Sequence, residues 1–148
     1  DKYIGDAIMA FWNAPLDDPN HACHAIVAAI EMRRGLAELN EELKNEGIEI
    51  HTGIGINTGP CIVGNMGSDS RFDYSVIGDA VNLASRLEGQ CKDFNTDLII
   101  SEFTMEQAPS NEYEKLGEVT VKGKNESVSI YTIPKINLDL SIQSYYNT

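Results

Sequence analysis

Residues 72–88 read FDYSVIGDAVNLASRLE, and within this short stretch a strand pattern changes into a helix pattern. Residues 72–77 predict a strand, and Gly78 with Asp79 predicts a turn in which Asp79 is the helix N-cap. A helix is expected over residues 80–91, where apolar residues recur at helical spacing. The stretch therefore predicts a strand that turns directly into a helix.

Two polar side chains give this helix a second distinct face. Asn82 and Arg86 are four residues apart, so they project together from the side opposite the apolar residues. An amide and a guanidinium placed there, directly after a strand, could bind a sugar and a phosphate. A solvated arginine beside its neighbour is the commoner arrangement of such a pair. The pattern alone leaves both interpretations open.

The first twelve residues, DKYIGDAIMAFW, predict a hairpin that bends at Gly5 and Asp6. A carboxylate at a strand turn, with Lys2 four residues upstream, suits metal or phosphate chemistry. Turn chemistry alone explains the same residues, because Asp and Gly are both common in tight turns. The remaining motifs have to decide between these interpretations.

A long amphipathic helix is predicted over residues 19–44, with Asp18 as its N-cap and a proline at its first position. Its charged residues, Arg33 among them, are expected on the solvent side. His21 and His24 are interpreted as surface residues, because a pair without a third ligand is seldom a metal site. The predicted buried stripe comprises Ala22, Ala25, Ile26, Ala29, Ile30, Leu36, Leu39 and Leu43.

Gly47 is expected to end this helix, and strict alternation then predicts a strand over residues 48–57. Gly53 and Gly55 fall on one face of that strand. Either another backbone or a ligand approaches closely there, or the strand bends or bulges. The sequence favours neither explanation.

The last third of the chain predicts a short buried strand over residues 97–101, a helical turn through residues 105–107, and a hairpin. The hairpin is expected to pair residues 113–122 with residues 127–133. Lys122 would then lie at the mouth of its turn.

Composition describes one ordinary globular domain, since the 148 residues are 42% hydrophobic and 23% charged. Acidic residues outnumber basic ones by 23 to 11, for a formal charge of −12. Such a balance argues against nucleic acid or an anionic membrane surface as the main partner. The three cysteines lack ligand spacing, which favours reduced thiols and a cytosolic location.

Three of these motifs together resemble the catalytic domain of class III nucleotidyl cyclases, the adenylate and guanylate cyclases. They are residues 2–6, residues 73–88 and residues 121–124. The resemblance runs over residues 1–134, and residues 135–148 are expected to be a tail or linker. It implies an α/β fold, an α+β sandwich with a ferredoxin-like βαββαβ core, of which this chain would lack the first strand and first helices.

The resemblance implies a role for each residue that matches a motif. Asn82 would orient the ribose of the nucleotide, Arg86 would stabilise charge developing on the phosphates, and Lys122 would bind the triphosphate tail. Asp6 matches the second of two metal-binding aspartates, which in the family hold two Mg²⁺ or Mn²⁺ ions. The chain supplies no match for the first aspartate, so as given it is expected not to turn over ATP, whereas the intact domain would.

The resemblance also implies a choice of base. Lys2 matches a base-reading lysine and Ser75 its partner on adenine, and together they can donate to and accept from that base. Guanylate cyclases of the family carry an acidic residue at the lysine position, so Lys2 favours ATP. Serine departs slightly from the threonine of a bacterial-type subgroup, some of whose members respond to bicarbonate.

The expected activity is therefore conversion of ATP to 3′,5′-cyclic AMP and pyrophosphate in intracellular signalling. The family works as a head-to-tail dimer with metal aspartates from one protomer and Asn/Arg from the other, so a homodimer is expected. Relatives usually carry an upstream sensor and face the cytosol, sometimes from a membrane-anchored receptor. A non-catalytic nucleotide-binding or dimerisation module and a guanylate cyclase are the alternatives.

Overall fold

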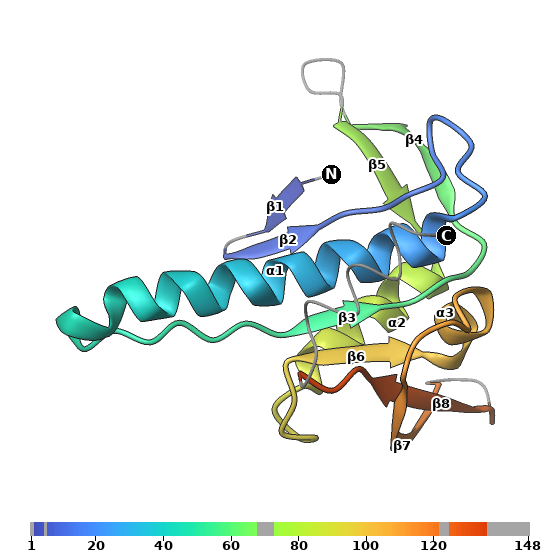
Figure 1. Cartoon of the computed structure of the whole chain (residues 1–148). Helices are drawn as coiled ribbons and strands as arrows, with labels where there is room; N and C mark the ends of the chain where they lie inside the picture. Colours follow the sequence, from blue (N-terminus) through green and yellow to red (C-terminus); the bar gives the residue numbers. More distant parts are fainter. Residues whose placement is uncertain (1, 5, 68–72, 122–124, 136–148) are drawn as a thin grey trace.

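The computed structural model describes residues 2–4, 6–67, 73–121 and 125–135 (Figure 1). Lys122 and residues 136–148 of the expected tail lie outside the described residues. The described strands are β1 (Lys2–Ile4), β2 (Ala7–Met9), β3 (Ile54–Ile56), β4 (Ile62–Met66), β5 (Asp73–Ile77), β6 (Leu98–Ser101), β7 (Glu114–Thr120) and β8 (Ser127–Thr132). The helices are α1 (His21–Leu43), α2 (Asp79–Gly89) and α3 (Glu102–Gln107), with a 3₁₀ turn η1 (Lys44–Glu46).

A four-stranded mixed sheet in the order β3-β6-β8-β7 forms the centre of the molecule. β3 and β6 are parallel, whereas β8 is antiparallel to both of its neighbours. The strands β1 and β2 form a separate antiparallel hairpin, as do β4 and β5. The predicted opening and C-terminal hairpins are thus confirmed.

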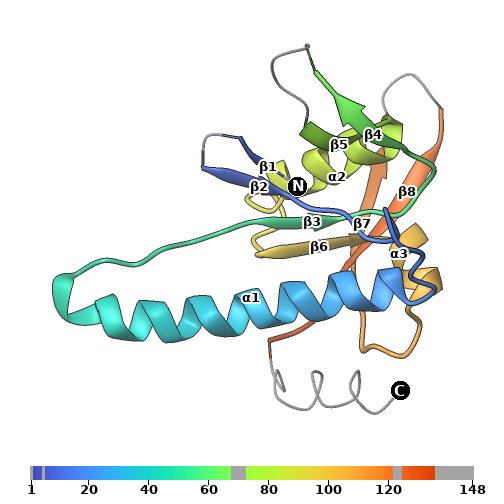
Figure 2. The ribbon, with the colours of Figure 1, turned by 90° about the horizontal axis from the view of Figure 1, so that it is seen from above.

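Two apolar clusters cover the two faces of this sheet. Successive residues of β6 alternate between them, so that Leu98 and Ile100 pack against α1 while Ile99 packs against α2. Figure 2 shows α1 and α2 on opposite sides of β3 and β6. The expected α/β architecture is confirmed, and β1, β2, α1 and β3 follow one another in the order of the last four elements of a βαββαβ core.

The second half of α1 departs from the prediction. Its buried residues end at Arg33, and the remainder of the helix projects from the body of the molecule (Figures 1 and 2). Leu39, predicted to be buried, is 39% exposed. The apolar pattern of the helix therefore continues past the sheet against which its first half packs.

Arg33, predicted on the solvent side, is 5% exposed. Its Nε and Nη2 donate to the carboxylate of Asp97 at 2.7 to 3.1 Å, and its Nη1 donates to the carbonyl of Ile133 at 2.6 Å. Burial is tolerated because the guanidinium is paired and hydrogen-bonded. This contact ties α1 to the start of β6 and to the end of β8.

The predicted strand over residues 48–57 is paired only over β3. Residues 48–53 run back along the projecting part of α1, and the Asn40 side chain holds them by bonding both the N–H and the carbonyl of Ile50, at 2.8 and 2.9 Å. The alternating pattern therefore predicted the extended conformation of residues 48–57 correctly, but it overestimated how many of them pair with a neighbouring strand.

Both predicted N-caps are wrong. The residue before α1 is Asn20, and Asp18 instead accepts a hydrogen bond from the Asn20 N–H at 3.0 Å and contacts His24 at 2.6 Å. Gly78 precedes α2 and Asp79 is the first helical residue, where a carboxylate faces the positive end of the helix dipole. No helix among the described residues is long and apolar enough to cross a membrane.

Candidate active site

Helix α2 presents the residues singled out by the sequence. Leu83 and Leu87 are buried in the cluster against β6, β7 and β8, and Asn82 and Arg86 are exposed on the other side. The helix starts directly after β5, through Gly78 at a φ of 148° that residues with a side chain rarely adopt. The predicted strand, turn and helix are confirmed, and both the amide of Asn82 and the guanidinium of Arg86 lie on the exposed side of the helix.

Two glycines, Gly53 just before β3 and Gly55 within it, explain how α2 is placed. A Cβ built on Gly55 would lie 2.4 Å from the carbonyl oxygen of Ala84 and 2.4 Å from the amide nitrogen of Glu88. A Cβ on Gly53 would lie 3.1 Å from the carbonyl oxygen of Glu88. Of the alternatives that the sequence left open, the close approach of another backbone is therefore correct.

Arg86 joins α2 to the end of the β7–β8 hairpin. Its Nη1 donates to the carbonyl of Thr120, the last residue of β7 and two residues before Lys122. The next residue, Val121, still bonds across the hairpin, from its N–H to the carbonyl of Glu126 at 3.0 Å. The structure thus brings the helix motif next to the segment that carries the lysine motif, although Lys122 itself is not among the described residues.

Asp6 is exposed at the bend between β1 and β2. The hairpin that carries it does not hydrogen-bond with the central sheet in the described parts of the chain. The segment after β2 reaches β5, where the rings of Phe11 and Tyr74 lie 5.9 Å apart. For Lys2, the structure describes the strand and not the side chain.

The described residues supply only some of the ligands that a divalent metal ion needs. Mg²⁺ in proteins is typically held by one or two carboxylates together with substrate phosphates, and the exposed carboxylate of Asp6 fits one such ligand. The described residues contain no group of three or more His, Cys, Asp or Glu side chains that could hold a metal ion. His21 and His24 accordingly take part in no such cluster.

Ser75 lies in the middle of β5, opposite Gly64 of β4, and is 3% exposed. A base could reach its hydroxyl only if the atoms that cover it moved. Among the candidate residues whose side chains the structure describes, Ser75 alone lies beneath the surface.

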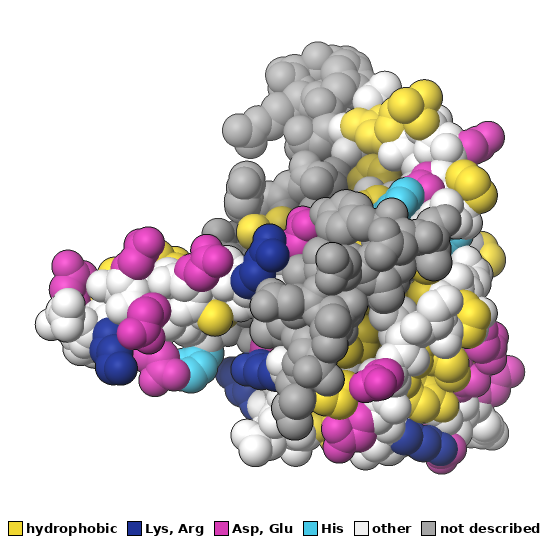
Figure 3. Space-filling model, in the orientation of Figure 1, with side chains coloured by type: hydrophobic (Ala, Val, Ile, Leu, Met, Phe, Trp, Pro, Cys, Tyr) yellow, Lys and Arg dark blue, Asp and Glu magenta, His cyan; other side chains and the backbone are white. Residues whose placement is uncertain are grey.

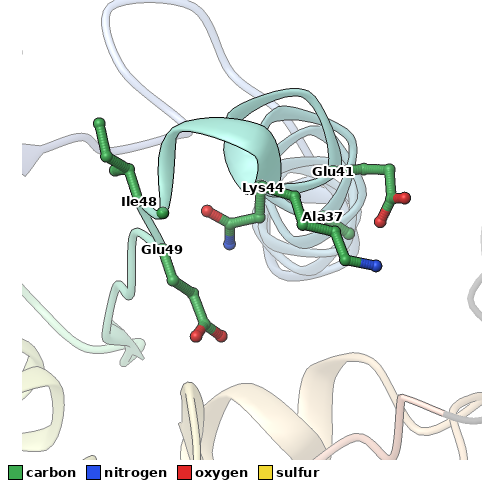
Figure 4. A pocket seen from close by; sticks show the side chains of 7 residues that line it. Ala37, Glu41, Lys44, Ile48 and Glu49 are labelled. Carbon is green, nitrogen blue, oxygen red and sulfur yellow. The ribbon is translucent and has the colours of Figure 1, made fainter.

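A cavity of about 400 Å³ lies at the end of α1, away from these residues (Figure 4). Glu41, Lys44 and Glu49 are among its lining residues, and in Figure 4 the two carboxylates point in different directions. Charged side chains that do not converge cannot together hold one ligand. Figure 3 likewise shows acidic side chains scattered over both α1 and the body of the molecule.

The family model of the adenylate and guanylate cyclase catalytic domain matches residues 2–135. The chain belongs to this family. Adenylate cyclase 1 of Rhizobium meliloti is 36% identical over 134 residues, which make up 89% of this chain and 20% of that protein. An adenylate cyclase of Anabaena cylindrica is 42% identical over 142 residues, 90% of this chain and 27% of that protein. This cyclase-family chain thus spans about a fifth to a quarter of these curated relatives.

Solved cyclase structures share the fold. The adenylyl cyclase CyaB from P. aeruginosa superposes with a TM-score of 0.76 at 34% identity, covering 90% of this chain and 70% of that one. The guanylyl cyclase Cya2 superposes with a TM-score of 0.75, also at 34% identity, covering 90% and 68%. Because an adenylyl and a guanylyl cyclase are equally similar to this chain, overall structural similarity does not distinguish ATP from GTP as the substrate.

Proposed function

We propose that this chain is the catalytic region of an adenylate cyclase, which converts ATP to 3′,5′-cyclic AMP and pyrophosphate. The observation that carries the proposal is the contact of Arg86 with Thr120, because it joins the helix motif to the lysine-bearing hairpin. Three phosphates need several donors that converge from different elements. Arg86 on α2 and Lys122 beyond β7 are such donors.

Each of these residues has a task in that reaction. Arg86 stabilises the charge that develops on the phosphates, and Lys122 binds the triphosphate tail. Asn82, one turn before Arg86 on the same exposed face, orients the ribose. Asp6 contributes one carboxylate to a Mg²⁺ or Mn²⁺ site, whose ions, when bound, lower the pKa of the ribose 3′-hydroxyl and neutralise phosphate charge. A second carboxylate is required to complete that site.

The preference for ATP is proposed to rest on Lys2 and on Ser75, whose buried hydroxyl becomes a base contact only when the atoms that cover it move. A lysine donates to the ring acceptors of adenine, and a hydroxyl can also accept from its exocyclic amine. Three of the curated relatives are named adenylate cyclases, which supports the same choice. The likeness to Cya2 keeps a guanylate cyclase as the alternative.

The catalytic assembly is proposed to be a homodimer in which Asp6 of one protomer and Asn82 with Arg86 of the other share a site. The exposed face of the β4–β5 hairpin supports a contact between copies. Ile62 and Ile77 lie directly opposite each other in its register and are 66% and 51% exposed. Paired apolar side chains in water favour association.

The proposed location is the cytosol, where ATP is available, and the proposed context is a longer signalling protein with an upstream sensor domain. Support comes from the curated relatives, of which this chain covers 6% to 27%. A non-catalytic module that only binds nucleotide or dimerises is the alternative from another class.

The proposal is tested by assaying the full-length protein for cyclic nucleotide with ATP or GTP and with Mg²⁺ or Mn²⁺. Cyclic AMP formation is expected, with ATP preferred. The Arg86→Ala variant is expected to lose a factor on the order of 10² to 10³ in kcat. Arg34→Ala removes another exposed arginine, on α1, and is the matched control. Nucleotide binding without turnover would favour the non-catalytic module, and preference for GTP would overturn the assignment of the base.

A further inference from the structure

Asn57 connects α2 to the interior of the molecule. It follows β3 directly and is half-buried, and its Nδ2 donates to the carbonyl of Ala80 at 2.9 Å, in the first turn of α2. Its Oδ1 accepts from the Ser101 hydroxyl at 2.6 Å. Both ends of the amide are thus engaged, one with the helix and the other with the end of β6.

Asn57 is hydrogen-bonded to a buried corner of the molecule, formed by Ser101 at the end of β6 and Thr104 in α3. Ser101 and Thr104 are both fully buried, and the hydroxyl of Ser101 accepts from the Thr104 N–H at 3.3 Å as the N-cap of α3. The hydroxyls of Thr104 and Thr58 lie 2.8 Å apart. Because a buried hydrogen-bonded group is costly to displace, this corner is a rigid reference point for the residues bonded to it.

Asn57 gives the start of α2 a side-chain hydrogen bond from outside the helix. The residue at its N-cap, Gly78, makes no side-chain capping hydrogen bond. The contacts of Gly53 and Gly55 with Ala84 and Glu88 fix how closely α2 approaches the sheet, but they lie beyond the first turn. At the first turn, a Cβ built on Gly59 would lie 2.8 Å from the Cβ of Ala80, a close contact without direction. Asn57 provides a directional bond at Ala80, two residues before Asn82.

We infer that Asn57 is a positioning residue, which sets the placement of Asn82 and Arg86 through its bond to the first turn of α2. It touches neither of these side chains and acts through the helix backbone. The kinetic part of this inference rests on the proposed function, whereas the structural part does not.

The structural part is tested by hydrogen exchange in the full-length protein. Asn57→Ala is expected to speed exchange of the first α2 amides that bond within the helix, such as that of Ala84, by tenfold or more. Amides of β6 and β8 are expected to keep their wild-type rates. The matched control is Asn40→Ala, because both ends of the Asn40 amide are also hydrogen-bonded, but to the backbone of Ile50 and not to α2. Unchanged exchange in α2, or equal changes in both variants, would overturn the inference.

The kinetic part is tested by separating kcat from KM. A displaced Arg86 weakens stabilisation of the transition state more than ground-state binding, so Asn57→Ala is expected to lower kcat at least tenfold and to change KM less than threefold. A purely structural role would lower the melting temperature and leave kcat per folded molecule unchanged, and that result would contradict the inference.

A double-mutant cycle tests whether Asn57 and Ser101 act together. Ser101→Ala removes the donor to Asn57 Oδ1, so it is expected to lower kcat by less than Asn57→Ala. The double variant is expected to resemble Asn57→Ala, since residues in one network are not additive. Additive losses of kcat would contradict the idea that Ser101 acts on α2 through Asn57. If Asn57→Ala fails to fold, Ser101→Ala alone decides. A loss of kcat together with faster hydrogen exchange in α2 supports the positioning role of Asn57, and wild-type kcat with wild-type exchange in α2 refutes it.

Discussion

Replacing Gly55 by alanine would force α2 away from the sheet. The added Cβ would lie 2.4 Å from two backbone atoms of α2, whereas ordinary van der Waals contact begins at 3.4 Å. Backbone atoms cannot rotate aside as a flexible side chain can, so the helix would have to withdraw by about 1 Å. Overpacking of this kind costs typically about 1 to 3 kcal/mol. For a chain of this size that corresponds to a fall in Tm of roughly 2 to 12 °C.

The same displacement would carry Arg86 and Asn82 with the helix. A misplacement of 1 Å can cost on the order of 10²-fold in rate, so the full-length Gly55→Ala protein is expected to lose cyclase activity by that order. Thermal unfolding followed by circular dichroism, and a kcat determination below the lowered Tm, measure the two effects.

The control is Gly35→Ala, at a helical position of α1 where a Cβ would meet no atom within 4 Å. Alanine in a helix interior is favoured over glycine by about 1 kcal/mol, so this variant is expected to melt higher and to keep its activity. A Gly55→Ala protein with wild-type Tm and activity would refute the close approach of α2 to β3.

Three further predictions follow from other contacts. Arg33→Leu leaves Asp97 without its buried partner and is expected to lower the free energy of unfolding by about 3 kcal/mol, measured by urea denaturation; a loss below about 1 kcal/mol would contradict the role given to this pair. Ile62→Lys is expected to shift sedimentation of the full-length protein toward monomer, while Leu16→Lys, at another exposed apolar residue, leaves it unchanged. Burial raises the pKa of Tyr113 to about 12, so the unfolded chain loses this proton first and stability is expected to fall between about pH 10 and pH 12; Tyr113→Phe should flatten that decline, and an identical decline would refute it.

Local signals were sufficient for the elements around α2. The strand β5, the turn at Gly78 and the exposure of Asn82 and Arg86 on one helix face all follow from spacing within one short segment. The hairpins were predictable for the same reason, since turn residues and alternation act over a few positions. Both N-caps were misassigned because several polar residues near a helix start can compete for that position.

Long-range contacts were not predictable. Nothing in the pattern of α1 distinguishes Arg33 from the charged residues around it, because its partner Asp97 is 64 residues away. The exposure of Leu39 depends on where the sheet ends and not on the helix itself. Asn57 was overlooked for the same reason, since its importance comes from Ala80 and Ser101. A polar residue at the end of a predicted strand that contains two glycines was the one available signal.

The sequence could predict which residues belong to the candidate site, but not how they are arranged in space. Arg86 and Lys122 were expected in one site. The contact with Thr120 places Arg86 beside the last residue of β7, and Lys122 lies outside the described residues. The joint action of Asp6, Lys2 and Ser75 with α2 remains a prediction, because those residues lie on other elements or beneath the surface.

The most direct test of the account is complementation between two inactive variants of the full-length protein. Asp6→Asn and Arg86→Ala are each expected to lower cyclic AMP formation by a factor on the order of 10² or more. In a head-to-tail dimer, each mixed dimer has one intact site and one that lacks both residues. Because random exchange makes about half of the dimers mixed, the mixture should reach about a quarter of wild-type activity. Recovery to that level is predicted. No recovery, although exchange of protomers is demonstrated by fluorescence energy transfer, would contradict a cyclase site shared between two copies of this chain.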